Sequence, residues 1–188
     1  MDVEEFIPPK RIRMIQISSL HLTKEETATI RAFTKYVLEK FVKKSIQYKS
    51  LVKIHVVHEN DLDNYADIDD LKKYRAWCYY DGVQNDRKVF RVMLNMKQIN
   101  KKAKKPLVRM KNILIDLAHE LVHVKQYMNS EIFDYVSGGV RYKGSYFDIS
   151  YQENEEMYYD SPWEIEAYGR EQGLYKMFVS KMRGTKKI

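Results

Sequence analysis

The chain has 188 residues, of which 44% are hydrophobic and 31% charged, with a net charge of +7. This balance excludes a disordered chain and is typical of one soluble domain. We expect a single domain over 1–188, with an irregular lead-in over 1–20 and a basic tail over 183–188. The single cysteine, Cys78, excludes an internal disulfide. No apolar stretch is long enough to span a bilayer and the N-terminus lacks a hydrophobic leader, so we expect a cytoplasmic protein that does not contact membranes.

The predicted elements follow an α+β order. The first helix begins at Thr23, because Thr23 and Glu26 have the spacing of a capping box, and it runs to about Ser45. Three strands with alternating apolar residues follow, over 51–58, 75–80 and 88–96. The acidic segment over 59–73 is predicted to be a loop or a short helix.

A second helix, over 107–128, contains His119-Glu120-Leu121-Val122-His123. Its apolar residues recur every three or four positions, whereas the histidines lie on a different face. Residues four apart on a helix lie above one another, so both imidazoles can reach one metal ion with Glu120 beside it. The spacing favours a zinc site with His119 and His123 as ligands. The alternative is a chance pattern in which the histidines only cap or hydrogen-bond.

A third protein ligand is expected, because catalytic zinc commonly has three together with a water. No histidine follows His123, so a carboxylate is needed, and the best candidates lie on the helix after Ser161. Ser161 and Glu164 have the spacing of a capping box, which would give Glu164 a structural role. We therefore favour Glu166 over Glu164. Either could instead be an exposed carboxylate favoured by the helix dipole.

An HExxH motif followed by a glutamate on a later helix resembles the gluzincin class of zinc metallopeptidases. The segments 119–127, 142–148 and 161–171 also resemble small metallopeptidase-like proteins of tailed bacteriophages, which would act in the host cytoplasm. The resemblance implies a minimal zincin-like fold, with a small antiparallel or mixed sheet packed on the N-terminal, HExxH and ligand helices. It also implies one Zn²⁺ held by His119, His123 and Glu166, with Glu120 as general base.

Such a site predicts hydrolysis of peptide bonds, in which Glu120 takes a proton from a water activated by zinc. Asp116, one turn before Glu120, is either a group that orients a ligand imidazole or part of a solvated surface. Donors to a developing oxyanion are not singled out by the sequence; the candidates are Tyr142, Tyr146, Tyr158, Tyr159, Tyr168 and Arg170.

Two segments are expected near the substrate. The turn composition of 137–139 predicts a hairpin over 133–149, which either covers the cleft or lies on the surface. The strand over 88–96 is expected beside the cleft, with Arg91 and Asn95 facing an extended peptide. His21, His55 and His58 are interpreted as structural.

The positive charge motivates a rival function. Lysine-rich runs over 35–53, 101–105 and 183–187 could attract an acidic partner, so the alternative is a nucleic-acid-associated protein with a structural or vestigial zinc site. Lysine-rich surfaces are also common as plain solvated faces. The expected partner is a protein or peptide substrate, with weak nucleic-acid association through these lysines. Without a coiled-coil pattern, we expect a monomer.

Overall fold

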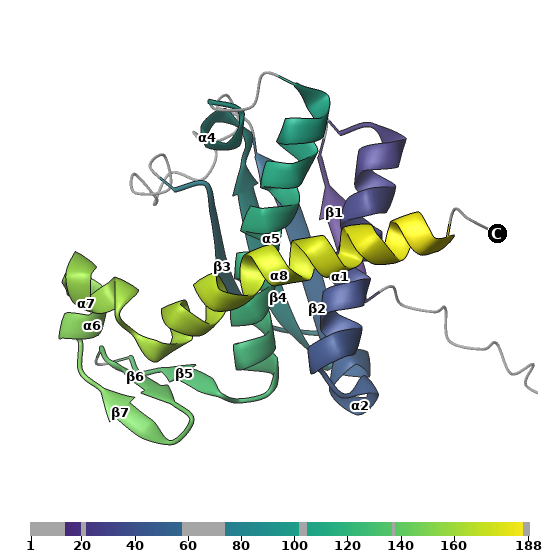
Figure 1. Ribbon diagram of the computed structural model, residues 1–188. Coiled ribbons are helices and arrows are strands. Elements are labelled where there is room, and N and C mark those ends of the chain that lie inside the picture. The colour runs from purple at the N-terminus through teal and green to yellow at the C-terminus, as the bar shows by residue number, and fades with distance from the viewer. Residues whose placement is uncertain (1–13, 20–21, 58–73, 102–104, 137, 186–188) are drawn as a thin grey trace, which may run out of the picture.

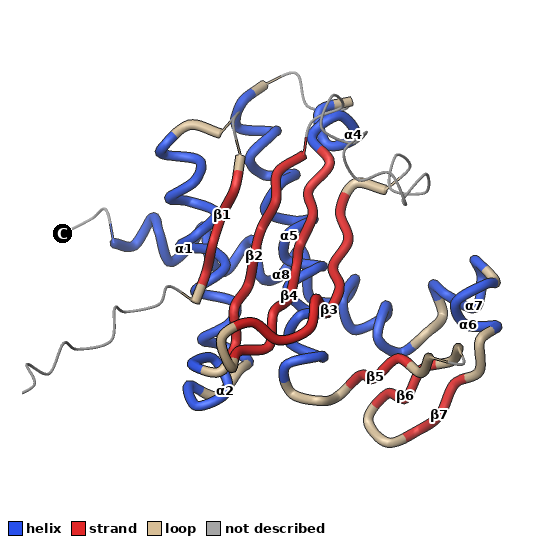
Figure 2. The backbone as a smooth tube through the Cα atoms, turned by 180° about the vertical axis from the view of Figure 1, so that it is seen from behind, coloured by secondary structure: helices blue, strands red, loops and turns tan. Residues whose placement is uncertain are grey.

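The computed structural model describes residues 14–19, 22–57, 74–101, 105–136 and 138–185, and shows a mixed α+β architecture. Its main sheet has the strand order β1-β2-β4-β3, and Figure 2 shows it from the side without long helices. The strands are β1 (Ile15–Ser18), β2 (Ser50–Val57), β3 (Ala76–Gln84) and β4 (Arg87–Asn95). β1, β2 and β4 run parallel, whereas β3 is antiparallel to β4 at the edge. The expected small mixed sheet is therefore present.

β4 lies in the interior of the sheet, which corrects the expectation that it borders a substrate. It pairs with β2 on one side and β3 on the other, and its apolar side chains are buried on both faces. Arg91 bonds to Asp81 at 2.6 Å, and the Asn95 side chain caps the short helix α4 (Met96–Asn100). β3 is an edge strand of this sheet, as is β1.

Three long helices build the other layers (Figure 1). α1 (Lys24–Phe41) and α5 (Pro106–Met128) pack against one face of the sheet, and α8 (Pro162–Thr185) crosses over α5. The capping box at Thr23 and Glu26 is formed as predicted. α1 ends earlier than expected because Val42 is extended, and a separate helix α2 (Lys44–Tyr48) follows.

A second, three-stranded sheet joins α5 to α8. Its strands are β5 (Ile132–Asp134), β6 (Val140–Tyr142) and β7 (Ser145–Phe147), all antiparallel. The segment expected as one strand over 141–149 is divided by a turn at Lys143 and Gly144, where both residues have positive φ. The inner face of this sheet packs on Trp163 of α8. Two short helices, α6 (Ser150–Glu153) and α7 (Glu155–Tyr159), precede α8.

Several features predicted from the sequence concern residues outside the part of the chain that the structure describes. The acidic segment 59–73, His21 and His58 lie outside the described residues, as do parts of two lysine-rich runs. A hydrogen bond of 2.9 Å joins His55 Nδ1 to Ser18 Oγ on the neighbouring strand, in agreement with a structural role. Within the described ranges, no helix combines the length and the apolar character needed to cross a bilayer.

Candidate metal centre

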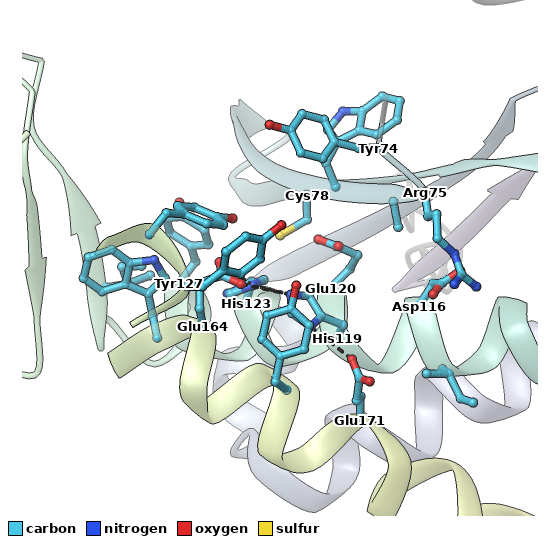
Figure 3. Close-up of a pocket in the computed structure, with 18 of the residues that line it drawn as sticks. Tyr74, Arg75, Cys78, Asp116, His119, Glu120, His123, Tyr127, Glu164 and Glu171 are labelled. Atoms are coloured by element: carbon cyan, nitrogen blue, oxygen red, sulfur yellow. Dashed lines mark hydrogen bonds and ion pairs between the residues drawn. The ribbon is translucent and has the colours of Figure 1, made fainter. Parts of the chain in front are cut away.

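Two helices bring three metal-binding side chains to one point (Figure 3). His119 and His123 lie one turn apart on α5, and Glu164 lies in the first turn of α8. The Nε2 atoms of the two histidines are 3.1 Å apart. Glu164 Oε2 is 3.2 Å from His119 Nε2, and Glu164 Oε1 is 3.2 Å from His123 Nε2. The three groups therefore face one another at nearly equal distances.

These distances match the donor set of a tetrahedral metal ion. Zinc bonds of about 2.0–2.1 Å at tetrahedral angles place neighbouring ligand atoms about 3.3 Å apart. Glu164 is 2% exposed, and its Oε2 accepts no hydrogen bond from the described residues although it faces His119. A buried carboxylate oxygen without a donor is stabilised by a nearby cation. The arrangement of Glu164 and the histidines fits that cation.

The other nitrogen of each imidazole is held by an oxygen acceptor. His119 Nδ1 lies 3.2 Å from Glu171 Oε2, and His123 Nδ1 lies 2.9 Å from Gln126 Oε1. An Nδ1–H that donates to these oxygens leaves the lone pair on Nε2. Both histidines are thus oriented with Nε2 ready to bind a metal. Sequence reasoning did not assign a role to Glu171 or Gln126.

The structure places Glu164 with the histidines and Glu166 elsewhere, which corrects our preference for Glu166. The Glu166 carboxylate accepts hydrogen bonds from Lys125, Gln126, Tyr142 and Arg170, at 2.9, 3.2, 2.7 and 2.9 Å. The physical reason for the wrong choice is the capping box assumed for Glu164. Ser161 Oγ is buried without a hydrogen-bond partner among the described groups, so that box is not formed.

Glu120 lies in the same cleft as the three groups (Figure 3). Its side chain is buried beside Cys78 of β3, with which it shares a hydrogen bond. Burial raises the pKa of Glu120, and the nearby histidines oppose this shift. Burial and the charge of Glu120 raise the pKa of the Cys78 thiol well above its ordinary value. Glu120 therefore holds a proton more readily than an exposed glutamate would.

The electrostatics of the cluster favour a positive charge at its centre. Burial lowers the pKa of His119, but the carboxylates of Glu164 and Glu171 outweigh it and raise the pKa to about 10. His123 behaves alike, because Glu164 overcomes the effect of burial and raises its pKa. Burial acts to raise the pKa of Glu164, but the two histidines hold it well below the ordinary value. Without a metal ion, protons on the imidazoles supply the required charge.

Two of the tyrosine candidates lie at this centre. Tyr158 lines the cleft and hydrogen-bonds to Glu164; burial and the charge of Glu164 raise its pKa. The ring of Tyr168 stands edge-on to His119, with centroids 4.5 Å apart. Burial and Glu164 raise the pKa of Tyr168 as well. Both hydroxyls therefore remain protonated, and that of Tyr158 already donates to Glu164.

The remaining candidates point to other contacts. Asp116 lines one end of the cleft but pairs with Arg75, at 2.9 Å to Nη2, and not with an imidazole. Burial raises the pKa of Asp116 to about 6, against the effect of Arg75. Arg170 binds Glu166 and lies over the Phe41 ring at 5.0 Å. The other three tyrosine candidates have separate surroundings. Tyr142 binds Glu166, Tyr146 is exposed on the small sheet, and Tyr159 lines the cleft.

The cleft around the centre has a volume of about 790 Å³. Its walls are the start of β3, α5, α8 and the small sheet, which contributes Ile132, Asp134 and Val140. This agrees with the interpretation in which the hairpin region shapes access to the site. The cleft is large enough for several residues of an extended chain or for a small molecule.

Comparisons with models of known families, with curated proteins and with solved structures gave no match. The resemblance to gluzincins therefore stays an expectation drawn from the order of the motifs. What the site does has to be argued from its own geometry.

Proposed function

We propose that this protein is a zinc-dependent hydrolase of peptide bonds, with His119, His123 and Glu164 as metal ligands and Glu120 as general base. The observation that carries the proposal is the convergence of two Nε2 atoms and one carboxylate at 3.1–3.2 Å, beside a second, buried carboxylate. A structural zinc site is usually closed by four protein ligands, whereas three ligands leave a position for water. The composition of the group favours catalysis.

The chemistry divides between the metal and the chain. Bound zinc would act as a Lewis acid on a carbonyl group and make water more acidic. Glu120 would accept the proton of the attacking water and pass it to the leaving amine, a role that suits a carboxylate with a raised pKa. The hydroxyl of Tyr168, whose ring stands against His119, would donate to the oxygen on which negative charge develops.

The position of β3 supports a peptide substrate. β3 is one of the two edge strands of the main sheet, and Ala76, Trp77 and Cys78 at its start line the cleft beside Glu120. An edge strand can pair with an extended peptide through its main-chain groups. A peptide bound in this way would run along β3 and present a carbonyl group to the metal centre.

Metal content tests the ligand set. Wild type, His123→Ala, Glu164→Ala and the control Glu166→Gln would be purified, reconstituted with zinc and measured by elemental analysis. We expect near-stoichiometric zinc in wild type and Glu166→Gln, and loss of zinc in the two ligand variants. Zinc that is retained by Glu164→Ala but lost from Glu166→Gln would contradict the assignment.

Activity tests the role of Glu120. The zinc-loaded protein would be assayed on a denatured protein substrate, with peptide products identified by mass spectrometry. Glu120→Gln should keep its zinc and lose hydrolysis by about 10²- to 10⁴-fold, because the proton acceptor is gone. Equal activity in Glu120→Gln, or no cleavage by zinc-loaded wild type, would contradict the proposed catalysis and leave a metal-binding protein.

A further inference from the structure

The cleft has two unlike ends, one on each side of the metal centre (Figure 3). At one end Asp116 forms an ion pair with Arg75 at 2.9 Å. At the other end lies Tyr127, whose hydroxyl donates to Asp134 of β5, and Asp134 lines the cleft wall. The Asp134 side chain is exposed, and among the described residues no cation pairs with it. The second end therefore presents an uncompensated negative charge to a ligand.

Tyr127 fixes the position of this carboxylate without neutralising it. Its hydroxyl lies 2.5 Å from Asp134 Oδ2. Burial and the charge of Asp134 raise the pKa of Tyr127, so the hydroxyl keeps its proton. Tyr127 follows His123 by one turn of α5, about 6 Å along the helix axis. About two residues of an extended chain span that distance, so Asp134 lies within reach of a side chain next to a bond held at the metal centre.

The wall around Asp134 is apolar. Ile132, Val140 and Trp163 line the cleft there and belong to one hydrophobic cluster beneath the small sheet. Asp134 is paired in register with Val140, so the carboxylate emerges next to this cluster. Lysine and arginine side chains combine an apolar stem with a cationic head. Such a stem fits the apolar wall, and such a head fits the carboxylate at its end.

The segment that surrounds this end of the cleft is acidic, although the whole chain carries +7. Residues 129–160 hold seven acidic and only two basic residues, and neither of the basic residues lines the cleft. The glutamates of α6 and α7 are exposed, and within the described ranges they form no ion pair; they are Glu153, Glu155 and Glu156. Both short helices also contribute to the cleft wall. The local field therefore attracts a positively charged ligand.

We propose that Asp134 makes this end of the cleft a subsite for a lysine or arginine side chain, so that the substrates are basic peptides with such a residue next to the cleaved bond. This specificity rests on the hydrolysis of peptide bonds proposed above and adds the class of peptide. The cationic head would pair with Asp134, while the stem lies along Ile132, Val140 and Trp163. The opposite end offers no equivalent site, because Asp116 is already paired with Arg75.

Peptide binding tests the subsite without turnover. Full-length, zinc-loaded Glu120→Gln protein would be titrated into short, end-capped fluorescent alanine peptides with one central lysine, norleucine or glutamate, and anisotropy would be measured. The lysine peptide should bind about 10-fold more tightly than the norleucine peptide, which has a similar stem and no charge. Added Asp134→Asn should make the two equal, and added Asp134→Lys should make the glutamate peptide bind most tightly.

The matched control is Asp148→Asn. It removes one negative charge from an exposed position of the same acidic segment, away from the cleft, so the preference for lysine should persist. Thermal unfolding should show that all variants are folded. Equal binding of the lysine and norleucine peptides, no binding of any peptide, or equal losses in Asp134→Asn and Asp148→Asn would overturn the subsite.

Mapping of cleavage products separates this specificity from the activity itself. Zinc-loaded protein with an intact Glu120 should cleave a denatured protein at bonds with lysine or arginine within about two residues, and Asp134→Asn should lose this enrichment. Cleavage without the enrichment would overturn the subsite and leave the hydrolase. A lysine preference in binding that depends on Asp134, without any cleavage, would support the subsite and contradict the hydrolase.

Discussion

Glu164 and Glu166 lie two residues apart on α8, yet their carboxylates serve different partners. Glu164 faces His119 and His123 at 3.2 Å, whereas Glu166 is bound by Lys125 and Gln126 of the same helix α5. The two are connected, because Gln126 bonds both to Glu166 and to His123. One carboxylate is thus placed to bind a metal, and the other is held among the polar side chains of α5 beside it.

Glu171→Gln should weaken zinc binding without abolishing it. Glu171 holds His119 through Nδ1 and adds negative charge to the centre. Loss of such a partner typically lowers metal affinity by about 10- to 100-fold. Competition with a zinc chelator measures the change, and Glu155→Gln on the exposed helix α7 is the control. An affinity equal to wild type would show that Glu171 does not position the imidazole.

Glu166→Gln should reduce stability while zinc stays bound. Glu166 is surrounded by Lys125, Gln126, Tyr142 and Arg170, and Lys125 is itself nearly buried. Loss of these charge-assisted hydrogen bonds should cost about 2–3 kcal/mol in the free energy of unfolding. Urea denaturation measures this cost.

The matched control for that variant is Glu39→Gln. Glu39 pairs with Lys35 at 3.6 Å on an exposed part of α1, so its loss should cost less than about 0.5 kcal/mol. If Glu166→Gln were no more destabilising than Glu39→Gln, the contacts around Glu166 would be structurally unimportant.

Asp116 should titrate near pH 6 in the folded protein. Burial raises its pKa to about 6 from an ordinary 3.8, while Arg75 opposes the shift. Because the folded state binds this proton more tightly, the cost of ionised Asp116 appears as pH rises from about 4 to about 6 and is complete above that. Asp116→Asn should therefore gain more stability at pH 7 than at pH 4.

The carboxyl ¹³C chemical shift of Asp116 measures this pKa directly. Arg75→Gln should move the midpoint upward, since it removes the only cation in contact with the carboxylate among the described residues. A midpoint near 3.8 in wild type would show that Asp116 is solvated.

Thr23→Ala should lower the free energy of unfolding by about 1 kcal/mol. Its hydroxyl accepts the Glu26 backbone N–H at 3.1 Å, and Glu26 in turn accepts the Thr23 N–H. Thr29→Ala is the control, because the Thr29 hydroxyl bonds within the helix to the Glu25 carbonyl, and alanine is the better helix former there. Equal changes in chemical-denaturation midpoints would mean that the cap contributes nothing.

Much of the fold follows from periodicity in the sequence, and so does the part of the site that lies on α5. The apolar stripe of α5 places the two histidines and Glu120 together, and the capping signal at Thr23 fixes the start of α1. On α8 the sequence led us to Glu166, whereas the burial pattern in the structure selects Glu164. The buried residues of this helix are Trp163, Glu164, Ala167, Leu174 and Phe178, a helical repeat that includes Glu164 and, seven residues on, Glu171, but excludes Glu166.

Other features depend on long-range pairing that one sequence does not specify. The strand patterns of β3 and β4 are readable, but which of them forms the edge depends on β2, which is distant in the chain and pairs with β4. The role of Gln126 likewise arises only when α8 brings the Trp163 carbonyl and Glu166 next to it. Local patterns predict elements, whereas these contacts require their assembly.

The proposed ligands lie on α5 and α8, which precede and follow the small sheet in the sequence. A metal ion bound to His123 and Glu164 would close β5, β6, β7, α6 and α7 into a loop, and closure of a loop lowers the entropy of the unfolded chain. The ion would then act as a cross-link between α5 and α8 as well as a cofactor. A single proteolytic cut between these helices should therefore leave two fragments that associate more tightly with zinc than without it.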